Sequence, residues 1–267
     1  MEKLRNTRIF GISIIRIFAY FLIYGFIGFI IELIFGIITK GVLESRTSFI
    51  NSPICGVYGI GATLMIVSLQ KYKCNSAKMF FVGFIVGTVT EYVVSFLAEA
   101  ILHVKWWDYS DRILNINGRV CLYYSIFWGA LGLLLIKKIN PTIDKFLNFI
   151  VKKLKPKTLN FLIKLTITFF VLDFFSTWIA IDLFTTRVIS QNNIDVKNKQ
   201  AIIQKYEHIY GNEKLSKFIY TFWGDKRMIK TYPNIKVQDK DGNQIYLDIY
   251  LKNIKPYFIK FFDKQLY

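Results

Sequence analysis

The sequence predicts an all-α fold: a polytopic membrane helical bundle of about five transmembrane helices, with a cytoplasmic amphipathic helix and a small C-terminal tail domain. Of the 267 residues, 53% are hydrophobic and 17% are aromatic, and the mean hydropathy is positive. Apolar runs of about 20 residues recur, which is the helical length that crosses ~30 Å of hydrocarbon. Because backbone groups in lipid must be satisfied internally, these runs are expected to be helices.

The expected spans lie in the first 184 residues. In chain order they are 14–38, 54–69, 79–102, 120–136 and 161–184, and the second is rather short. The first is too long for a signal-peptide core. We therefore divide the chain into a four-helix transmembrane region (1–138), a cytoplasmic amphipathic connector (139–160), the fifth transmembrane helix (161–184) and a polar, basic C-terminal tail (185–267).

The distribution of basic residues predicts the orientation in the cell membrane. Lys and Arg are more frequent before the first span, between spans two and three, and between spans four and five than in the alternate loops. The positive-inside rule then puts the N-terminus in the cytoplasm, and five crossings leave the tail extracytoplasmic. In 141–155, apolar residues recur at helical spacing opposite lysines, which predicts an amphipathic helix in the cytoplasmic headgroup layer. A plain soluble connector is the alternative.

The tail contains short patterns rather than a further span. Two amphipathic helices are expected, one ending at Gly211 and one near 215–223. Alternating apolar residues on both sides of Asp241 and Gly242 predict a hairpin, although the apolar residues from Leu247 onward equally suit a helix. We expect the tail to pack on the membrane surface or on a partner.

The formal net charge of +17 favours membrane lipids over nucleic acid as the partner. The basic residues lie between apolar spans, where they contact anionic headgroups, and not on one folded face. Three cysteines without a CxxC spacing predict no metal site. The sequence also lacks the GxxxxGK[ST], HExxH and GxSxG motifs, so we expect no cofactor and no catalytic residues, and the chain is not itself a P-loop ATPase.

Acidic residues inside the expected spans are the first candidates for a site, because charges in the membrane are costly and usually functional. Glu91, Ser95 and Glu99 follow one another at intervals of four, which places them on one helix face. Such a stripe is expected to face the bundle interior or a wet cavity. Glu32 in the first span and Asp173 in the fifth are the other intramembrane candidates.

The loop after the third span adds polar residues at the outer side. Two tryptophans precede Asp108 and Tyr109, and Arg119 opens the fourth span. The predicted topology places Arg119 on the same side as the Glu32, Glu99 and Asp108 carboxylates, so we expect Arg119 to pair with one or more of them. The cluster either binds a substrate, an ion or a lipid headgroup, or only locks the helices together. The full candidate set is Glu32, Glu91, Ser95, Glu99, Asp108, Tyr109, Arg119 and Asp173.

Several of these segments together resemble a known family. They are IYGFIG (23–28) with Glu32, YGIG (58–61), EY (91–92), WWDYS (106–110), NGRVCL (117–122) and WG (128–129). With them the chain resembles the CmpB-type putative ABC-transporter family, putative ABC-transporter type IV, over roughly 18–145. The resemblance implies a membrane component of permease type and supplies no substrate.

The leading functional hypothesis is a permease-like multi-pass protein, possibly the membrane subunit of an ABC-type transport system. It would need a separate ATPase subunit or a homo-oligomer, and 137–160 is the only sizeable cytoplasmic element for docking. One alternative is an intramembrane enzyme or lipid-handling protein that acts on headgroups. The other is a membrane scaffold or sensor whose tail binds a partner.

Overall fold

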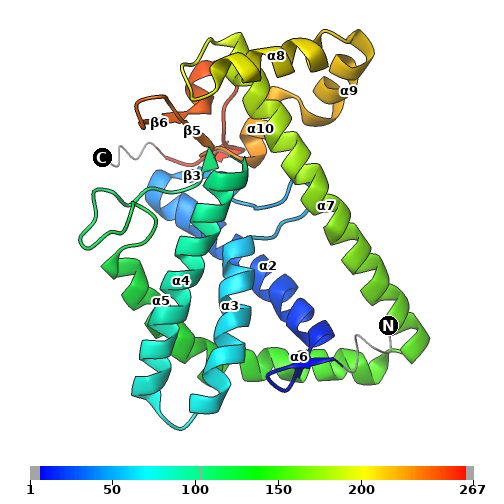
Figure 1. The fold of residues 1–267 in the computed structure, drawn as a ribbon. Helices are drawn as coiled ribbons and strands as arrows, with labels where there is room; N and C mark the ends of the chain where they lie inside the picture. Colours follow the sequence, from blue (N-terminus) through cyan, green and yellow to red (C-terminus); the bar gives the residue numbers. More distant parts are fainter. Residues whose placement is uncertain (1–6, 103, 263–267) are drawn as a thin grey trace. The chain divides into compact units, whose positions relative to one another are not determined.

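The structure, a computed structural model, describes residues 7–102 and 104–262 and is mostly helical (Figure 1). In chain order, the helices are α2 (Ile14–Lys40), α3 (Gly56–Leu69), α4 (Ser76–Leu102), α5 (Leu122–Leu134), α6 (Asn140–Lys153), α7 (Pro156–Gln191), α8 (Lys199–Tyr210), α9 (Glu213–Trp223) and α10 (Asp225–Thr231). A π-helix, Leu135–Ile139, joins α5 to α6, and 3₁₀ turns cover Gln70–Tyr72 and Leu247–Tyr250. The strands are β1 (Arg8–Ile9), β2 (Ile12–Ser13), β3 (Val42–Leu43), β4 (Val104–Lys105), β5 (Lys236–Gln238), β6 (Gln244–Tyr246) and β7 (Ile259–Lys260).

Four helical segments among the described residues are long and apolar enough to cross a membrane. They are Ile14–Lys40, Ser76–Ile101, Leu122–Lys153 and Pro156–Gln191. This confirms the all-α membrane class. The predicted span at 54–69 forms α3, whose 14 residues extend about 21 Å at 1.5 Å per residue. That is shorter than a ~30 Å hydrocarbon core, so α3 lacks the length of a full crossing.

The helix α7 changes from exposed to buried partway along its length. Its exposed large apolar side chains lie between Phe161 and Ile179, which is about 27 Å along a helix. From Ala180 to Ile189 most of its residues are buried. The helix therefore continues seven residues beyond the predicted span, and this extension forms part of a protein core.

The chain divides into two compact units, which are described separately. The first unit is Met1–Gly28, Pro53–Val94 and Asp108–Leu172; the second is Phe29–Ser52, Ser95–Trp107 and Asp173–Tyr267. The first unit packs its helices through glycines. A Cβ atom added to Gly87 would lie 2.4 Å from the Trp128 Cβ, and one on Gly28 would lie 2.3 Å from the Tyr58 Cβ. Only a glycine permits such close approach of membrane helices.

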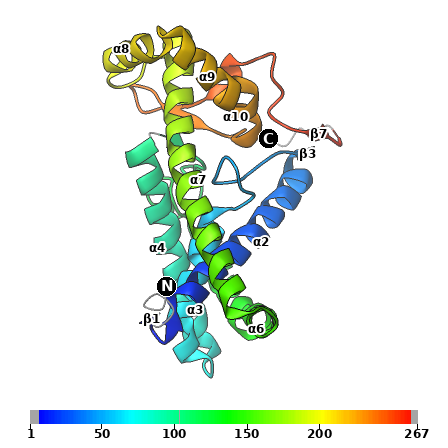
Figure 2. The ribbon, with the colours of Figure 1, turned by 90° about the vertical axis from the view of Figure 1, so that its right-hand side faces the viewer.

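The predicted amphipathic connector is a helix, α6, in the first unit. Figure 1 shows it lengthwise and Figure 2 shows it end-on, so α6 runs across the direction of α3 and α5. Ile143 and Leu147 pack against the unit's buried core, whereas Phe146 and Phe149 are exposed. Asp144 anchors the helix through an ion pair with Arg16 of α2 at 2.7 Å. Its location in the headgroup layer stays a prediction.

The second unit contains a core of buried hydrophobic residues around the C-terminal part of α7, and α8, α9 and α10 lie around that end of the helix (Figure 2). Strands β4, β5 and β6 form an antiparallel sheet, and Val237 pairs with both Val104 and Ile245. The β5–β6 hairpin turns near Gly242, whose φ of +93° favours glycine. The hairpin, one of the two interpretations of this segment, is therefore confirmed.

Candidate functional site

The centre of the candidate site in the first unit is Glu91, on the candidate membrane helix α4. Its side chain is buried, with 5% of the residue exposed. One carboxylate oxygen accepts a hydrogen bond from the Tyr109 hydroxyl at 3.1 Å, and the other accepts one from the Trp128 Nε1–H at 3.2 Å. Both donors are neutral, and Glu91 forms no ion pair with any residue that the structure describes.

The loop that precedes α5 positions Tyr109. The backbone N–H of Tyr109 donates to the Gly118 carbonyl at 2.8 Å, so the WWDYS and NGR segments are joined to one another. Asn117 and Gly118 form the turn with φ of +54° and +65°. The Tyr109 ring stacks on Tyr124 with a centroid distance of 4.7 Å. Burial raises the pKa of Tyr109, and the charge of Glu91 raises it further, so this hydroxyl remains a hydrogen-bond donor at neutral pH.

Two further candidates belong to the same loop. Asp108 accepts hydrogen bonds from the Ser110 backbone N–H at 3.1 Å and from the Ser110 hydroxyl at 2.6 Å. The Arg119 guanidinium lies over the Tyr92 ring, 5.8 Å from its centroid. Asp108 therefore stabilises the turn, and Arg119 lies against a residue of α4. The first unit thus contains Glu91, Asp108, Tyr109 and Arg119, and it joins Glu91 directly to Tyr109.

The remaining candidates lie in the second unit. Glu32 forms an ion pair at 2.9 Å with Arg46, and Arg46 also binds Glu44 at 2.9 Å. Ser95 is buried and Glu99 is half-buried, both on α4. Asp173 is 2% exposed and accepts hydrogen bonds from Asn51. The pairing of Arg119 with an acidic residue stays a prediction.

Sequence reasoning did not identify the partner that Glu32 has in the structure. Arg46 lies 14 positions after Glu32, in the loop that follows α2, where the sequence alone gives no pairing pattern. Lys40 also belongs to this group of charged residues, because its Nζ contacts the Glu44 carboxylate at 2.9 Å. The helical i, i+4 rule does not explain the Lys40–Glu44 pair, because α2 ends at Lys40 and Glu44 follows strand β3.

Arg187 is a second residue that sequence reasoning missed. It is fully buried at the end of α7, and it binds the Asp225 carboxylate at 2.5 Å, the Tyr210 hydroxyl at 3.0 Å and the Trp223 carbonyl at 3.0 Å. Its guanidinium also lies 4.7 Å from the centroid of the Tyr220 ring. Arg187 therefore connects α7 with the helices of the tail.

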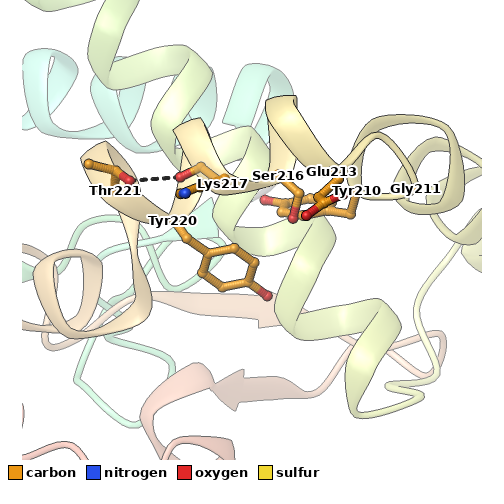
Figure 3. A pocket seen from close by; sticks show the side chains of 7 residues that line it. All are labelled: Tyr210, Gly211, Glu213, Ser216, Lys217, Tyr220 and Thr221. Atoms are coloured by element: carbon orange, nitrogen blue, oxygen red, sulfur yellow. Dashed lines mark hydrogen bonds between the residues drawn. The ribbon is translucent and has the colours of Figure 1, made fainter.

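A shallow surface depression lies near these tyrosines (Figure 3). It is lined by Tyr210, Gly211, Glu213, Ser216, Lys217, Tyr220 and Thr221. The hydroxyls of Tyr210 and Tyr220 are occupied by Arg187 and Gln191, and Thr221 donates to the Lys217 carbonyl at 2.8 Å. Because these polar groups already serve the local fold, the depression is a weaker candidate than Glu91.

Comparison with known proteins agrees with the resemblance of the motifs. The family model described as putative ABC-transporter type IV, ABC_trans_CmpB, matches residues 19–178, which is more than half of the chain. No curated protein and no solved structure matches the chain. The matched region includes Glu91, Tyr109 and Trp128. This chain belongs to the putative ABC-transporter type IV (CmpB) family.

Proposed function

We propose that the chain is a permease-like membrane subunit of an ABC-type transport system, and that Glu91 is the membrane residue on which its cycle depends. The family and the membrane-length helices support a transport-related membrane protein. The proposal that the transport cycle depends on Glu91 rests on one observation: Glu91 is buried and has no ionic partner among the described residues. A carboxylate in this position destabilises the helix bundle, and proteins retain such a residue mainly where it has a function.

The two donors to Glu91 come from separate segments, and this supports a role in conformational change. Tyr109 belongs to the loop before α5, and Trp128 lies within α5. Protonation or binding of a substrate cation at Glu91 would weaken both hydrogen bonds together, because it neutralises the carboxylate charge that strengthens them. The occupancy of one carboxylate would then change how the loop and α5 are held against α4.

The energy source must be a separate chain under this proposal, because the sequence has no phosphate-binding loop. The helix α6 is the docking surface that we favour for an ATPase. It is anchored by the Arg16–Asp144 ion pair, and it exposes Phe146 and Phe149 together with lysines at its C-terminal end.

The first test is purification of the tagged full-length chain in a gentle detergent, followed by identification of bound chains and measurement of ATP hydrolysis. We expect an ATPase to co-purify, and we expect Phe146→Ser with Phe149→Ser to remove it. Phe222→Ser, which changes a phenylalanine of similar exposure on α9, is the matched control and should retain the ATPase. Recovery of neither an ATPase nor a second copy of the chain would refute the proposal.

The second test addresses Glu91 in the purified complex. Glu91→Gln should keep the ATPase bound but change its rate of ATP hydrolysis severalfold, whereas Glu207→Gln on the exposed surface of α8 should leave the rate unchanged. Equal rates for both variants would remove Glu91 from the proposal. Action on lipid headgroups predicts a different result, in which Glu99→Gln and Asp108→Asn alter the headgroup composition of the membrane.

A further inference from the structure

Six buried side-chain oxygen atoms in the second unit have no hydrogen-bond partner among the residues that the structure describes, and three of them belong to residues near one part of α7. These three are Asp173 Oδ2, Tyr232 Oη and Ser52 Oγ. The three residues are 2%, 2% and 7% exposed. Buried polar atoms in proteins are nearly always paired, so three unpaired oxygens in one neighbourhood require an explanation.

The three residues belong to one neighbourhood. Asp173 Oδ1 accepts hydrogen bonds from the backbone N–H of Asn51 at 3.1 Å and from its side-chain amide at 2.8 Å. One turn further along α7, Thr177 accepts from the Ile50 N–H at 2.9 Å. The segment that contains Ser52 is therefore held on the face of α7 that carries Asp173. Tyr232 belongs to the same neighbourhood, because its hydroxyl interacts with the side chains of Thr177 and Asp173.

The charge of Asp173 is not balanced by a direct ion pair within the described residues. The Arg227 guanidinium binds the Asn51 side-chain oxygen at 2.8 Å, so it reaches the carboxylate only through that amide. Asp182, nine residues further along the same helix, provides the contrast. It is 44% exposed and is paired with Lys205 at 2.6 Å. A buried carboxylate without such a partner is costly unless a cation compensates it.

We propose that Asp173 Oδ2, Tyr232 Oη and Ser52 Oγ bind a small monovalent metal cation of the size of Na⁺. Hard cations take oxygen ligands, and one carboxylate with two neutral hydroxyls matches a single positive charge. The described residues contain no group of three or more His, Cys, Asp or Glu side chains that would suit a transition metal. This inference does not depend on an ATPase partner or on Glu91.

The test is thermal unfolding of the purified full-length chain in nanodiscs, with NaCl exchanged for choline chloride at constant ionic strength. We expect Na⁺ to raise the unfolding midpoint by about 2 °C or more, as a ligand that binds only the folded state does. Fluorescence provides a local signal, because the Trp106 ring lies 5.4 Å from the Tyr232 ring. A wild-type chain that responds to none of Li⁺, Na⁺ and K⁺ would overturn the proposal, as would a response to pH alone, which would indicate a proton or a bound water.

Matched variants separate this site from general salt effects. Asp173→Asn keeps one acceptor for Asn51 but removes the charge, so the Na⁺ response should disappear. Asp182→Asn should retain the full response, because that carboxylate is solvated and paired. If Asp173→Asn does not fold, Tyr232→Phe keeps the ring contact with Trp106 and should shift the Na⁺ concentration at half-response upward severalfold. An unchanged response in Tyr232→Phe would contradict the assignment of its hydroxyl as a ligand.

Discussion

Two buried charges, Glu91 in the first unit and Arg187 in the second, are held in opposite ways. In the first unit, Glu91 is held by two neutral donors, the Tyr109 hydroxyl and the Trp128 indole. In the second unit, the fully buried Arg187 meets the Asp225 carboxylate. A buried ion pair with complete hydrogen bonding holds a structure together, and breaking it is costly. An uncompensated buried carboxylate lowers stability, which proteins tolerate mainly at functional sites.

The largest effect is expected from removing Arg187. Arg187→Met leaves the Asp225 carboxylate without its cation and leaves the Trp223 carbonyl without its donor. We expect the second unit to lose about 3–5 kcal/mol of unfolding free energy. Denaturant titration followed by tryptophan fluorescence measures this loss, because Trp223 lies at the site.

The double variant Arg187→Met with Asp225→Leu is the control for that prediction. Replacing both partners by apolar side chains removes the unpaired charge, so most of the lost stability should return. A loss below about 1 kcal/mol in Arg187→Met alone would mean that the pair does not stabilise the unit, and the contrast with Glu91 would then be invalid.

The packing of the first unit should be sensitive at particular glycines only. Gly87→Ala places a Cβ 2.4 Å from both Cβ and Cγ of Trp128, so α4 and α5 must move apart. We expect a loss of about 1–3 kcal/mol, seen as a lower thermal midpoint in nanodiscs. Gly61→Ala is the matched control, because its nearest contact, also with Trp128, would be 3.8 Å. Equal midpoints for the two variants would show that the close approach at Gly87 is not needed.

The sequence predicted the membrane class and singled out Glu91 as a candidate, because both conclusions depend on local spacing. That Glu91, Ser95 and Glu99 form one site stays a prediction. Apolar runs of membrane length and acidic residues within them are visible without tertiary structure. Tyr109 was identified through its motif, and its direct bond to Glu91 required the turn at Asn117 and Gly118.

The features that sequence reasoning missed depend on long-range contacts. Arg46 reaches Glu32 only because the loop after α2 folds back, and Arg187 meets Asp225 across 38 positions. The fifth predicted helix also ended too early, because α7 continues to Gln191. The apolar pattern of α7 does not show where lipid exposure gives way to a protein core, since both environments select the same residue types.

Neutralising Glu91 should change stability less than breaking the Arg187 pair. Glu91→Gln keeps one acceptor oxygen and loses the other, but it also removes a buried charge. These two effects oppose one another, so we expect a net change within about 1 kcal/mol. Asp225→Asn is the matched comparison and should cost more, because it leaves Arg187 as an uncompensated cation. If Glu91→Gln is the more destabilising variant, Glu91 is a structural residue and not a functional one.

The smallest effect is expected from acid titration of Glu44. Burial alone raises the pKa of Glu44, but Lys40, Arg46 and Asn234 outweigh that effect, so its pKa lies below the ordinary value. A lowered pKa contributes stability that is present above the unfolded-state pKa, about 4.3, and is lost as the pH falls through the folded-state value. Thermal midpoints measured from pH 7 to pH 3 should therefore fall less for Glu44→Gln than for the wild type.

The control for the acid titration is Asp195→Asn. The hydrogen bond from Lys240 lowers the pKa of Asp195 as well, but both side chains are more than half exposed. Water and salt screen an exposed pair, so this variant should keep the acid sensitivity of the wild type. If Asp195→Asn flattens the pH dependence as much as Glu44→Gln does, then burial is not what makes an ion pair stabilise the second unit. The difference in stability between the buried ion pairs of the second unit and the unpaired Glu91 would then need an explanation other than burial.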